Sequence, residues 1–146
     1  MNAVTAFRPV DRSTGRVAVA VAALGVAGVC LSFAGMQVAL AAGAPLGEHV
    51  WGGAYDRVLP TGMRVAAAGA AVALPAMAAV VARRAGLVGR PARWLTPATC
   101  IIAGFLALNT VGNLASSSSV ERFAFAPAAA AASVLTTLVA FGARRS

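Results

Sequence analysis

The stretch VAVAVAALGVAGVCLSFAGMQVALAA, from Val17 to Ala42, contains no charged residue and decides the fold class. About 20 consecutive apolar residues are enough to cross the hydrocarbon core of a bilayer as an α-helix. Three further stretches, at about 61–82, 97–114 and 120–141, have the same apolar character. The sequence therefore predicts an all-α membrane protein whose four transmembrane helices pack as an up-down-up-down bundle.

The composition of the whole chain favours the same class of protein. Of its 146 residues, 60% are hydrophobic and 11% are charged, whereas ordinary soluble domains carry about 25% charged residues. The mean hydropathy is +0.81. We expect a single membrane domain over residues 1–146, with a polar leader at 1–16 and a loop at 43–60 as the longest connection.

The basic residues, all of which are arginine, are sorted by the predicted spans onto two sides. One side has a single acid, Asp11, and nine arginines: Arg8, Arg12, Arg16, Arg83, Arg84, Arg90, Arg93, Arg144 and Arg145. The other side balances Arg57, Arg64 and Arg122 against Glu48, Asp56 and Glu121. Because cytoplasmic segments carry the excess of Arg and Lys, both termini and the 1–16 leader are predicted to be cytoplasmic, and the 43–60 loop external.

The same arginines indicate the surroundings of the protein. The absence of lysine and the abundance of alanine and glycine are typical of high-GC bacterial genomes, so we expect a multi-pass protein of a bacterial cytoplasmic membrane. The net charge is +8, and the cytoplasmic arginines are predicted to contact anionic lipid heads. We expect no nucleic-acid partner, because the arginines flank apolar spans and form no basic stripe on a soluble fold.

A second interpretation of the first span stays open. Basic residues, an apolar run and Ala39-Leu40-Ala41 also describe a cleavable signal peptide, and cleavage would leave three spans. The run is longer than the usual 7–15 residues of such peptides, which favours a permanent helix. Cys30 and Cys100 are predicted at different depths in the membrane, so we expect no disulfide between them.

Several short patterns predict local structure within and between the spans. Gly28, Ser32 and Gly35 form a small-residue stripe, which allows another helix to approach closely. Pro127 falls early in the fourth span, where the helix has to adjust to the missing N–H group.

Helix caps are predicted at three places in the sequence. Thr61 and Thr96 stand where the second and third spans begin, and threonine is a good N-cap residue. Ser118 and Glu121 have the spacing of a capping box, in which each side chain bonds the backbone N–H of the other residue.

The polar side chains gather near the outer end of the predicted bundle. We expect a candidate polar pocket formed by Gln37, Glu48, His49, Asp56, Arg64, Asn109, Asn113, Glu121 and Arg122. Asn109 and Asn113 are four residues apart and so share one helix face. The alternative is that this pair hydrogen-bonds to a neighbouring helix, which is the commoner role of amides in membranes. No spacing of metal-ligating residues appears, so we predict no metal site.

The functional hypotheses follow from what the spans lack. No ionisable residue falls in the middle of a span, where ion-coupled carriers usually place one. The sequence also has no nucleophile, phosphate-loop or haem motif, so we predict no catalytic residue and no cofactor.

These absences favour a non-enzymatic accessory or assembly subunit with a protein partner or a homo-oligomeric state. One alternative is an outward-facing small-molecule or lipid-binding or transport module that works as an oligomer. The other is an intramembrane enzyme that uses Glu48 and His49 as an acid–base pair.

Two segments of the sequence carry a resemblance. The first joins His49-Val50-Trp51-Gly52-Gly53 to Leu59-Pro60 and Arg64, and the second joins LNTVGNLAS, at 108–116, to Glu121-Arg122. Over about residues 17–142 the chain resembles a group of small four-span bacterial integral membrane proteins. The resemblance implies the four-span fold and attaches no activity, so it assigns no catalytic role to any residue.

Overall fold

The computed structural model describes residues 12–142, and these form four long helices without a β-strand. They are α1 (Arg12–Ala41), α2 (Thr61–Ala85), α3 (Thr96–Ala115) and α4 (Ala126–Gly142). A π-helical turn, η4 (Glu121–Phe125), runs directly into α4. The prediction of an all-α protein with four helices long and apolar enough to span a membrane is confirmed.

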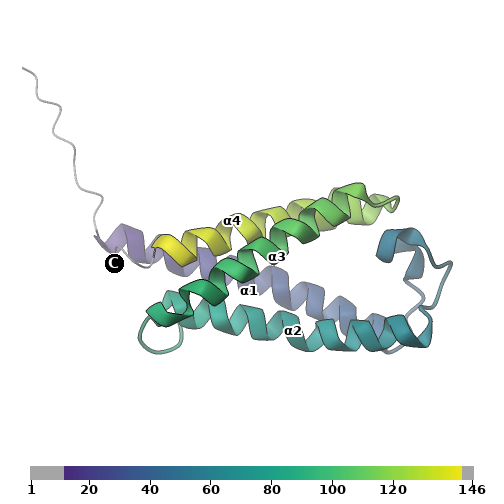
Figure 1. Cartoon of the computed structure of the whole chain (residues 1–146), viewed down its shortest axis with the longest axis horizontal. Coiled ribbons are helices and arrows are strands. Elements are labelled where there is room, and N and C mark those ends of the chain that lie inside the picture. The colour runs from purple at the N-terminus through teal and green to yellow at the C-terminus, as the bar shows by residue number, and fades with distance from the viewer. Residues whose placement is uncertain (1–11, 143–146) are drawn as a thin grey trace, which may run out of the picture.

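The helices pair along the bundle in an unequal way. Consecutive helices run in opposite directions, so the described ends of α1 and α4 lie together (Figure 1). Helix α1 packs against α2 and α4, and α3 packs against α4, while α2 and α3 make little contact. The buried core contains residues of all four helices, among them Val26, Cys30, Val81, Leu106 and Val139. One flank of the bundle, between α2 and α3, is therefore less closed than the others.

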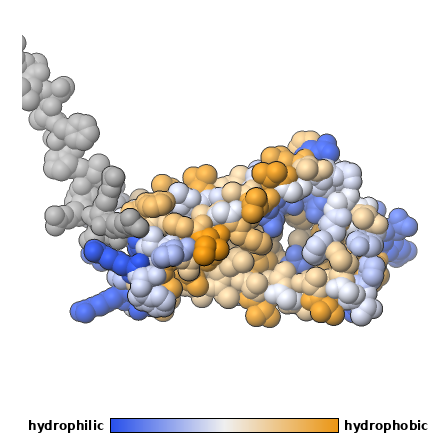
Figure 2. Space-filling model, viewed as in Figure 1, coloured by the Kyte–Doolittle hydropathy of each residue, from blue (hydrophilic) through white to orange (hydrophobic). Residues whose placement is uncertain are grey.

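The outer surface of the helices is apolar between two polar ends (Figure 2). Val72, Leu108 and Phe123 are each more than 70% exposed. A surface of this kind is unfavourable in water and suits the hydrocarbon core of a bilayer. The arrangement is compatible with a multi-pass membrane protein.

At the end of the bundle where α1 begins and α4 ends, which we call the termini end, Arg84 joins three helices. Its side chain is fully buried. Its Nε donates to Thr96 Oγ1 at 3.0 Å, and its Nη2 donates to the Ala140 carbonyl at 2.8 Å. Arg84 thus joins α2, α3 and the last turn of α4, where a cation also suits the helix dipole. We expected Arg84 to face lipid heads with the other arginines of this end; that expectation is wrong because the side chain is buried.

Two of the predicted helix caps are absent from the described structure. Helix α2 begins at Thr61, but its N-cap position is Pro60 and no side chain caps it. The hydroxyl of Thr96 donates to the Arg93 carbonyl at 2.8 Å and accepts from Arg84, so it does not cap α3. The helix boundaries at these positions follow the sequence pattern, while the hydroxyl groups bond elsewhere.

The remaining local predictions have mixed outcomes. Helix α1 begins at Arg12, within the predicted polar leader 1–16, and residues 1–11 of that leader lie outside the described residues. The adjustment expected near Pro127 is the π-helical turn η4 immediately before α4. Gly28 and Gly35 point away from the other described helices, since a Cβ added at either would meet nothing within 4 Å.

Candidate functional site

The 43–60 loop is fastened to the α3–α4 turn by one buried carboxylate, that of Glu121, which is 8% exposed. Its Oε1 accepts a hydrogen bond from the backbone N–H of Trp51 at 2.7 Å, and its Oε2 accepts one from Gly52 at 2.8 Å. The hydroxyl of Ser116 donates to the same carboxylate. The loop segment 49–53 and the segment that ends in Glu121-Arg122 therefore meet at Glu121, although about 70 residues separate them in the sequence.

The backbone around Trp51 is shaped to present its N–H groups to this carboxylate. Trp51, Gly52 and Gly53 all have positive φ angles, of 54°, 76° and 70°. Glycine adopts this conformation freely, whereas a tryptophan there is uncommon. Successive N–H groups in such a turn form a concave anion-binding nest, and here the anion is the chain's own carboxylate.

Further hydrogen bonds close the contact between the loop and the serine-rich turn. Ser117 Oγ donates to the Gly52 carbonyl, and Ser118 Oγ donates to the His49 carbonyl at 3.2 Å. On the other side of the turn, Arg122 Nη2 donates to the Ser116 carbonyl at 2.7 Å. We call this set of contacts, from residues 49–52 to residues 116–122, the loop latch.

The predicted capping box at Ser118 and Glu121 is wrong. The backbone N–H of Ser118 donates to Ser116 Oγ at 3.0 Å, and the hydroxyl of Ser118 bonds the loop. The Glu121 carboxylate bonds two loop amides instead of the N–H of Ser118. Glu121 thus has a long-range role in place of the predicted local one.

A cavity of about 370 Å³ lies beneath the loop latch. Helix α1, helix α2, helix α3, the loop and η4 all contribute to its wall. Its polar lining residues are Gln37, Asn109, Asn113 and Glu121, with Trp51 beside them. The apolar lining residues are Phe33, Met36, Val50, Ala70, Ala73, Leu74, Met77, Phe105, Leu106 and Phe125. A volume of this size and an apolar wall with a few polar groups are typical of small-molecule sites.

The amides in the cavity retain hydrogen-bonding capacity. Asn113 Nδ2 donates to Asn109 Oδ1 at 3.2 Å, so these two bond each other along α3. The alternative prediction, that the pair bonds a neighbouring helix, has no such bond among the described contacts. Gln37 Oε1 is buried and accepts no hydrogen bond from any residue in the described range 12–142. A buried carbonyl oxygen without a donor is costly, which makes this atom a candidate ligand contact.

The structure divides the nine residues of the predicted pocket into two groups. Four of them line the cavity: Gln37, Asn109, Asn113 and Glu121. The other five do not: Glu48, His49, Asp56, Arg64 and Arg122.

Each of the five outside the cavity has a place on the surface or in the loop contacts. Arg64 Nε donates to the Ala41 carbonyl at 3.0 Å and so holds the start of α2 to the end of α1. Asp56 is exposed. The Oε1 of Glu48 lies 3.5 Å from the Nε2 of His49, and the two side chains are 62% and 45% exposed. The structure does not give this acid–base pair the enclosed site that the enzyme hypothesis requires.

Sequence reasoning missed two residues of the site. Trp51 is not among the nine residues of the predicted pocket, although the Trp-Gly-Gly pattern signals a backbone that can reach positive φ angles. Ser116 is also absent from the predicted pocket, and its hydroxyl donates to Glu121 and accepts from the N–H of Ser118. The apolar lining of the cavity has no signal of its own, because the same residue types form the core.

The cavity opens on the flank between α2 and α3, where the two helices make little contact. Ala73 of α2 and Phe105 of α3 line it and are exposed. On this face the surface is hollowed between the two helices, with hydrophilic residues at the bottom of the hollow (Figure 2). A bilayer around the bundle would meet this opening from the side.

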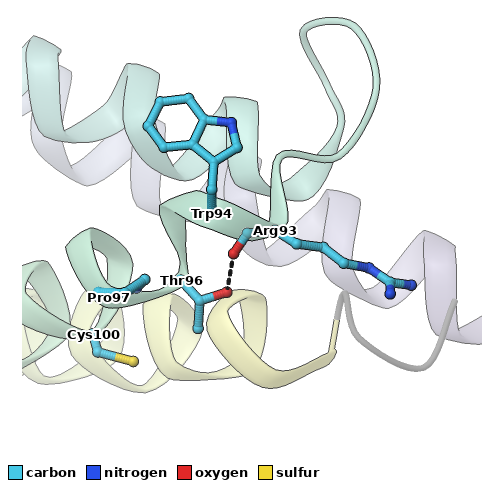
Figure 3. Close-up of a pocket in the computed structure, with 5 residues that line it drawn as sticks. All are labelled: Arg93, Trp94, Thr96, Pro97 and Cys100. Carbon is cyan, nitrogen blue, oxygen red and sulfur yellow. Dashed lines mark hydrogen bonds between the residues drawn. The ribbon is translucent and has the colours of Figure 1, made fainter.

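A second, shallower hollow lies at the termini end, around Arg93, Trp94, Thr96, Pro97 and Cys100 (Figure 3). The Arg93 guanidinium and the Trp94 ring point in different directions, and the Thr96 hydroxyl bonds the Arg93 carbonyl. Its polar groups do not converge on one point. The hollow therefore offers an interfacial surface and no enclosed site.

The described residues contain no group of three or more His, Cys, Asp and Glu side chains that could hold a metal ion. Comparison of the chain with known protein families, with curated proteins and with solved structures finds no match. The resemblance to small four-span bacterial proteins therefore stays a prediction.

Proposed function

We propose that this protein is a non-enzymatic binding module of a bacterial cytoplasmic membrane that holds a small amphipathic or lipid-like molecule in the cavity beneath the loop latch. The observation that carries the proposal is the convergence of Gln37, Asn109, Asn113 and Glu121 on one otherwise apolar cavity. Apolar walls supply affinity, and a few fixed polar groups supply orientation and selectivity.

The orientation in the membrane is part of the proposal. The described arginines of the termini end, including Arg16, Arg90 and Arg93, support a cytoplasmic location for that end. Their exposed side chains suit contact with anionic lipid heads. The loop latch and the cavity then face outward, as expected for a module that receives its ligand from the outer leaflet or from outside the cell.

The first test is the mass and composition of the complex extracted in mild detergent from its native membrane. Native mass spectrometry of the wild type should show the chain with a retained small molecule. Asn109→Ala should lose that molecule, and Leu108→Ala, a change at a neighbouring side chain that is 74% exposed, should keep it. A wild-type mass equal to that of the bare chain would argue against the binding proposal.

A second function, an accessory or assembly subunit, is favoured by a different observation. Gly28, Ser32 and Gly35 lie on the outer side of α1 and are exposed. Such a stripe allows a helix of another subunit to approach closely. In the same experiment this function predicts a larger assembly that contains a second protein or further copies of this chain. Gly28→Leu should break up this assembly and leave the fold of the chain intact.

A further inference from the structure

We infer that the ligand is a single-chain amphiphile whose head group donates hydrogen bonds and carries no negative charge, and that it enters sideways from the bilayer between α2 and α3. This inference rests on the proposed binding function and names its ligand class and route. It follows from three properties of the cavity: its polarity gradient, the chemistry of its polar end and its position on the least closed flank.

The polarity of the cavity changes along the membrane normal. On α3, Asn113 and Asn109 lie toward the loop end, and Leu106 and Phe105 lie deeper in the span. On α1, Gln37 lies toward the loop end and Phe33 lies one turn deeper. At about 1.5 Å per residue, the α3 wall runs roughly 12 Å from its amide end to its apolar end. This gradient parallels that of a lipid leaflet, with the head at the interface and the chain toward the midplane.

The polar end selects the head group by charge and by hydrogen bonding. Among the lining residues within the described chain, Glu121 alone is ionisable, and none is basic. A phosphate or carboxylate head would meet the Glu121 carboxylate with no cation beside it, which is unfavourable at low dielectric. The unpartnered Gln37 Oε1 requires a donor. A hydroxyl or an amine meets both conditions.

The size of the cavity limits the hydrophobic part. Its volume of about 370 Å³ lies at the lower end of the range of about 300–1,000 Å³ that is usual for small-molecule sites. One short chain fits such a space, and two full acyl chains do not. The ligand is therefore a single-chain amphiphile and not an ordinary two-chain phospholipid.

The route follows from where the cavity meets the surface. The loop latch lies at its loop end, where Trp51 is one of the lining residues. The flank between α2 and α3 has no comparable cover, since the small Ala70 and Ala73 form the α2 side of the opening. An amphiphile in the leaflet thus reaches the cavity without leaving the bilayer and without opening the latch.

The test uses the two tryptophans of the chain as reporters. Trp51 lines the cavity, and Trp94 lies at the opposite end of the bundle. The Trp94→Phe variant is placed in phosphatidylcholine vesicles, and its fluorescence is titrated with a monoacylglycerol whose chain is brominated next to the head group, because bromine quenches on contact and Trp51 lies at the polar end of the cavity. The matched control is Trp51→Phe, in which Trp94 reports ordinary partitioning of the probe.

The inference expects saturable quenching of Trp51 by the monoacylglycerol or by the corresponding brominated alkylamine, and gradual, non-saturating quenching of Trp94. Gln37→Leu should raise the half-saturating probe fraction about three- to tenfold, the equivalent of one lost hydrogen bond. Ala73→Leu, which narrows the opening, should lose the saturable phase. Ala79→Leu, on an exposed part of α2 outside the cavity, should keep it.

Three results would each overturn a part of the inference. Equal saturable quenching by a lysophosphatidate with the same chain would refute the head-group selection, and saturable quenching that survives in Ala73→Leu would refute the lateral route. Gradual quenching of Trp51 by every probe would refute the amphiphile class itself. In each case the proposed binding function is judged separately by the molecule that the wild type retains on extraction and that Asn109→Ala loses.

Discussion

Each end of the bundle is organised around one buried charge, and the two ends use that charge differently. At the termini end, the Arg84 guanidinium donates to Thr96 and to the last turn of α4. At the loop end, the Glu121 carboxylate accepts from the backbone of Trp51 and Gly52. Arg84 joins helices to each other, whereas Glu121 joins a loop to a helix turn.

The consequence of this difference is one end without an enclosed site and one end with a cavity. Arg84 lies with Val81 and Ala140 among residues that are completely buried. Beneath the Glu121 contacts the helices diverge around a cavity of about 370 Å³. The Arg84 side chain lies between helices and fills the space there. The Glu121 carboxylate bonds a loop at the end of the bundle and leaves the space between the helices unfilled. The comparison predicts that substitutions at the first end affect the fold and that substitutions at the second affect the site.

The largest effect is expected from Arg84→Ala. The change removes a long buried side chain and leaves Thr96 Oγ1 and the Ala140 carbonyl without their donor, so the free energy of unfolding should fall by about 3–5 kcal/mol. Arg84→Lys keeps the charge but loses the two-pronged donor geometry. Its free energy of unfolding should therefore lie between those of the wild type and Arg84→Ala. The measurement is reversible unfolding in mixed micelles. Arg90→Ala, at an exposed arginine of the same end, is the control and should change stability by less than about 0.5 kcal/mol.

A smaller and more local effect is expected from Glu121→Ala. Charged hydrogen bonds contribute about 1.5–3 kcal/mol each, and part of this loss is recovered when the freed loop amides bond to water. We expect a fall of about 2 kcal/mol, with faster hydrogen exchange at the Trp51 and Gly52 amides. Glu48→Gln, at an exposed acid of the same loop, should leave both amides protected. Unchanged protection in Glu121→Ala would show that the serine contacts alone hold the loop.

The fold was predictable because the forces that decide it leave local marks in the sequence. Uninterrupted apolar runs mark helices that must cross hydrocarbon, and the arginines gather where those runs end. The same features do not predict that Arg83 and Arg84 differ in burial. Arg83 is partly exposed and bonds its own loop, while its neighbour turns into the bundle. Which of two adjacent arginines is buried depends on the packing of α3 and α4, which the local pattern does not contain.

The sequence pattern contains only those parts of the site that helical periodicity and depth along a span decide. The i, i+4 spacing of Asn109 and Asn113 placed them on one face, and the hydrogen bond between them agrees. The spacing of Ser118 and Glu121 predicted a capping box, but the carboxylate bonds loop amides about 70 residues away. The positive φ angles of Trp51 and Gly52 direct two amides toward one carboxylate. Two hydrogen bonds to these amides replace the single bond to the N–H of Ser118 that a capping box would make.

The smallest effect, and the one of opposite sign, is expected from Gln37→Leu. Gln37 Oε1 is buried and receives no hydrogen bond from the described part of the chain, so an apolar side chain of similar volume should raise the free energy of unfolding by about 1 kcal/mol. Val38→Leu, at the adjacent position that is 58% exposed, should leave stability unchanged in the same micelle titration.

A gain in stability together with a loss of ligand would identify Gln37 as a residue kept for binding at a cost to the fold. A loss of stability in Gln37→Leu would mean that this amide is bonded within the fold. The proposed head group would then have no free acceptor at Gln37. The contrast between the Arg84 end and the Glu121 end would still hold, because neither buried charge depends on Gln37.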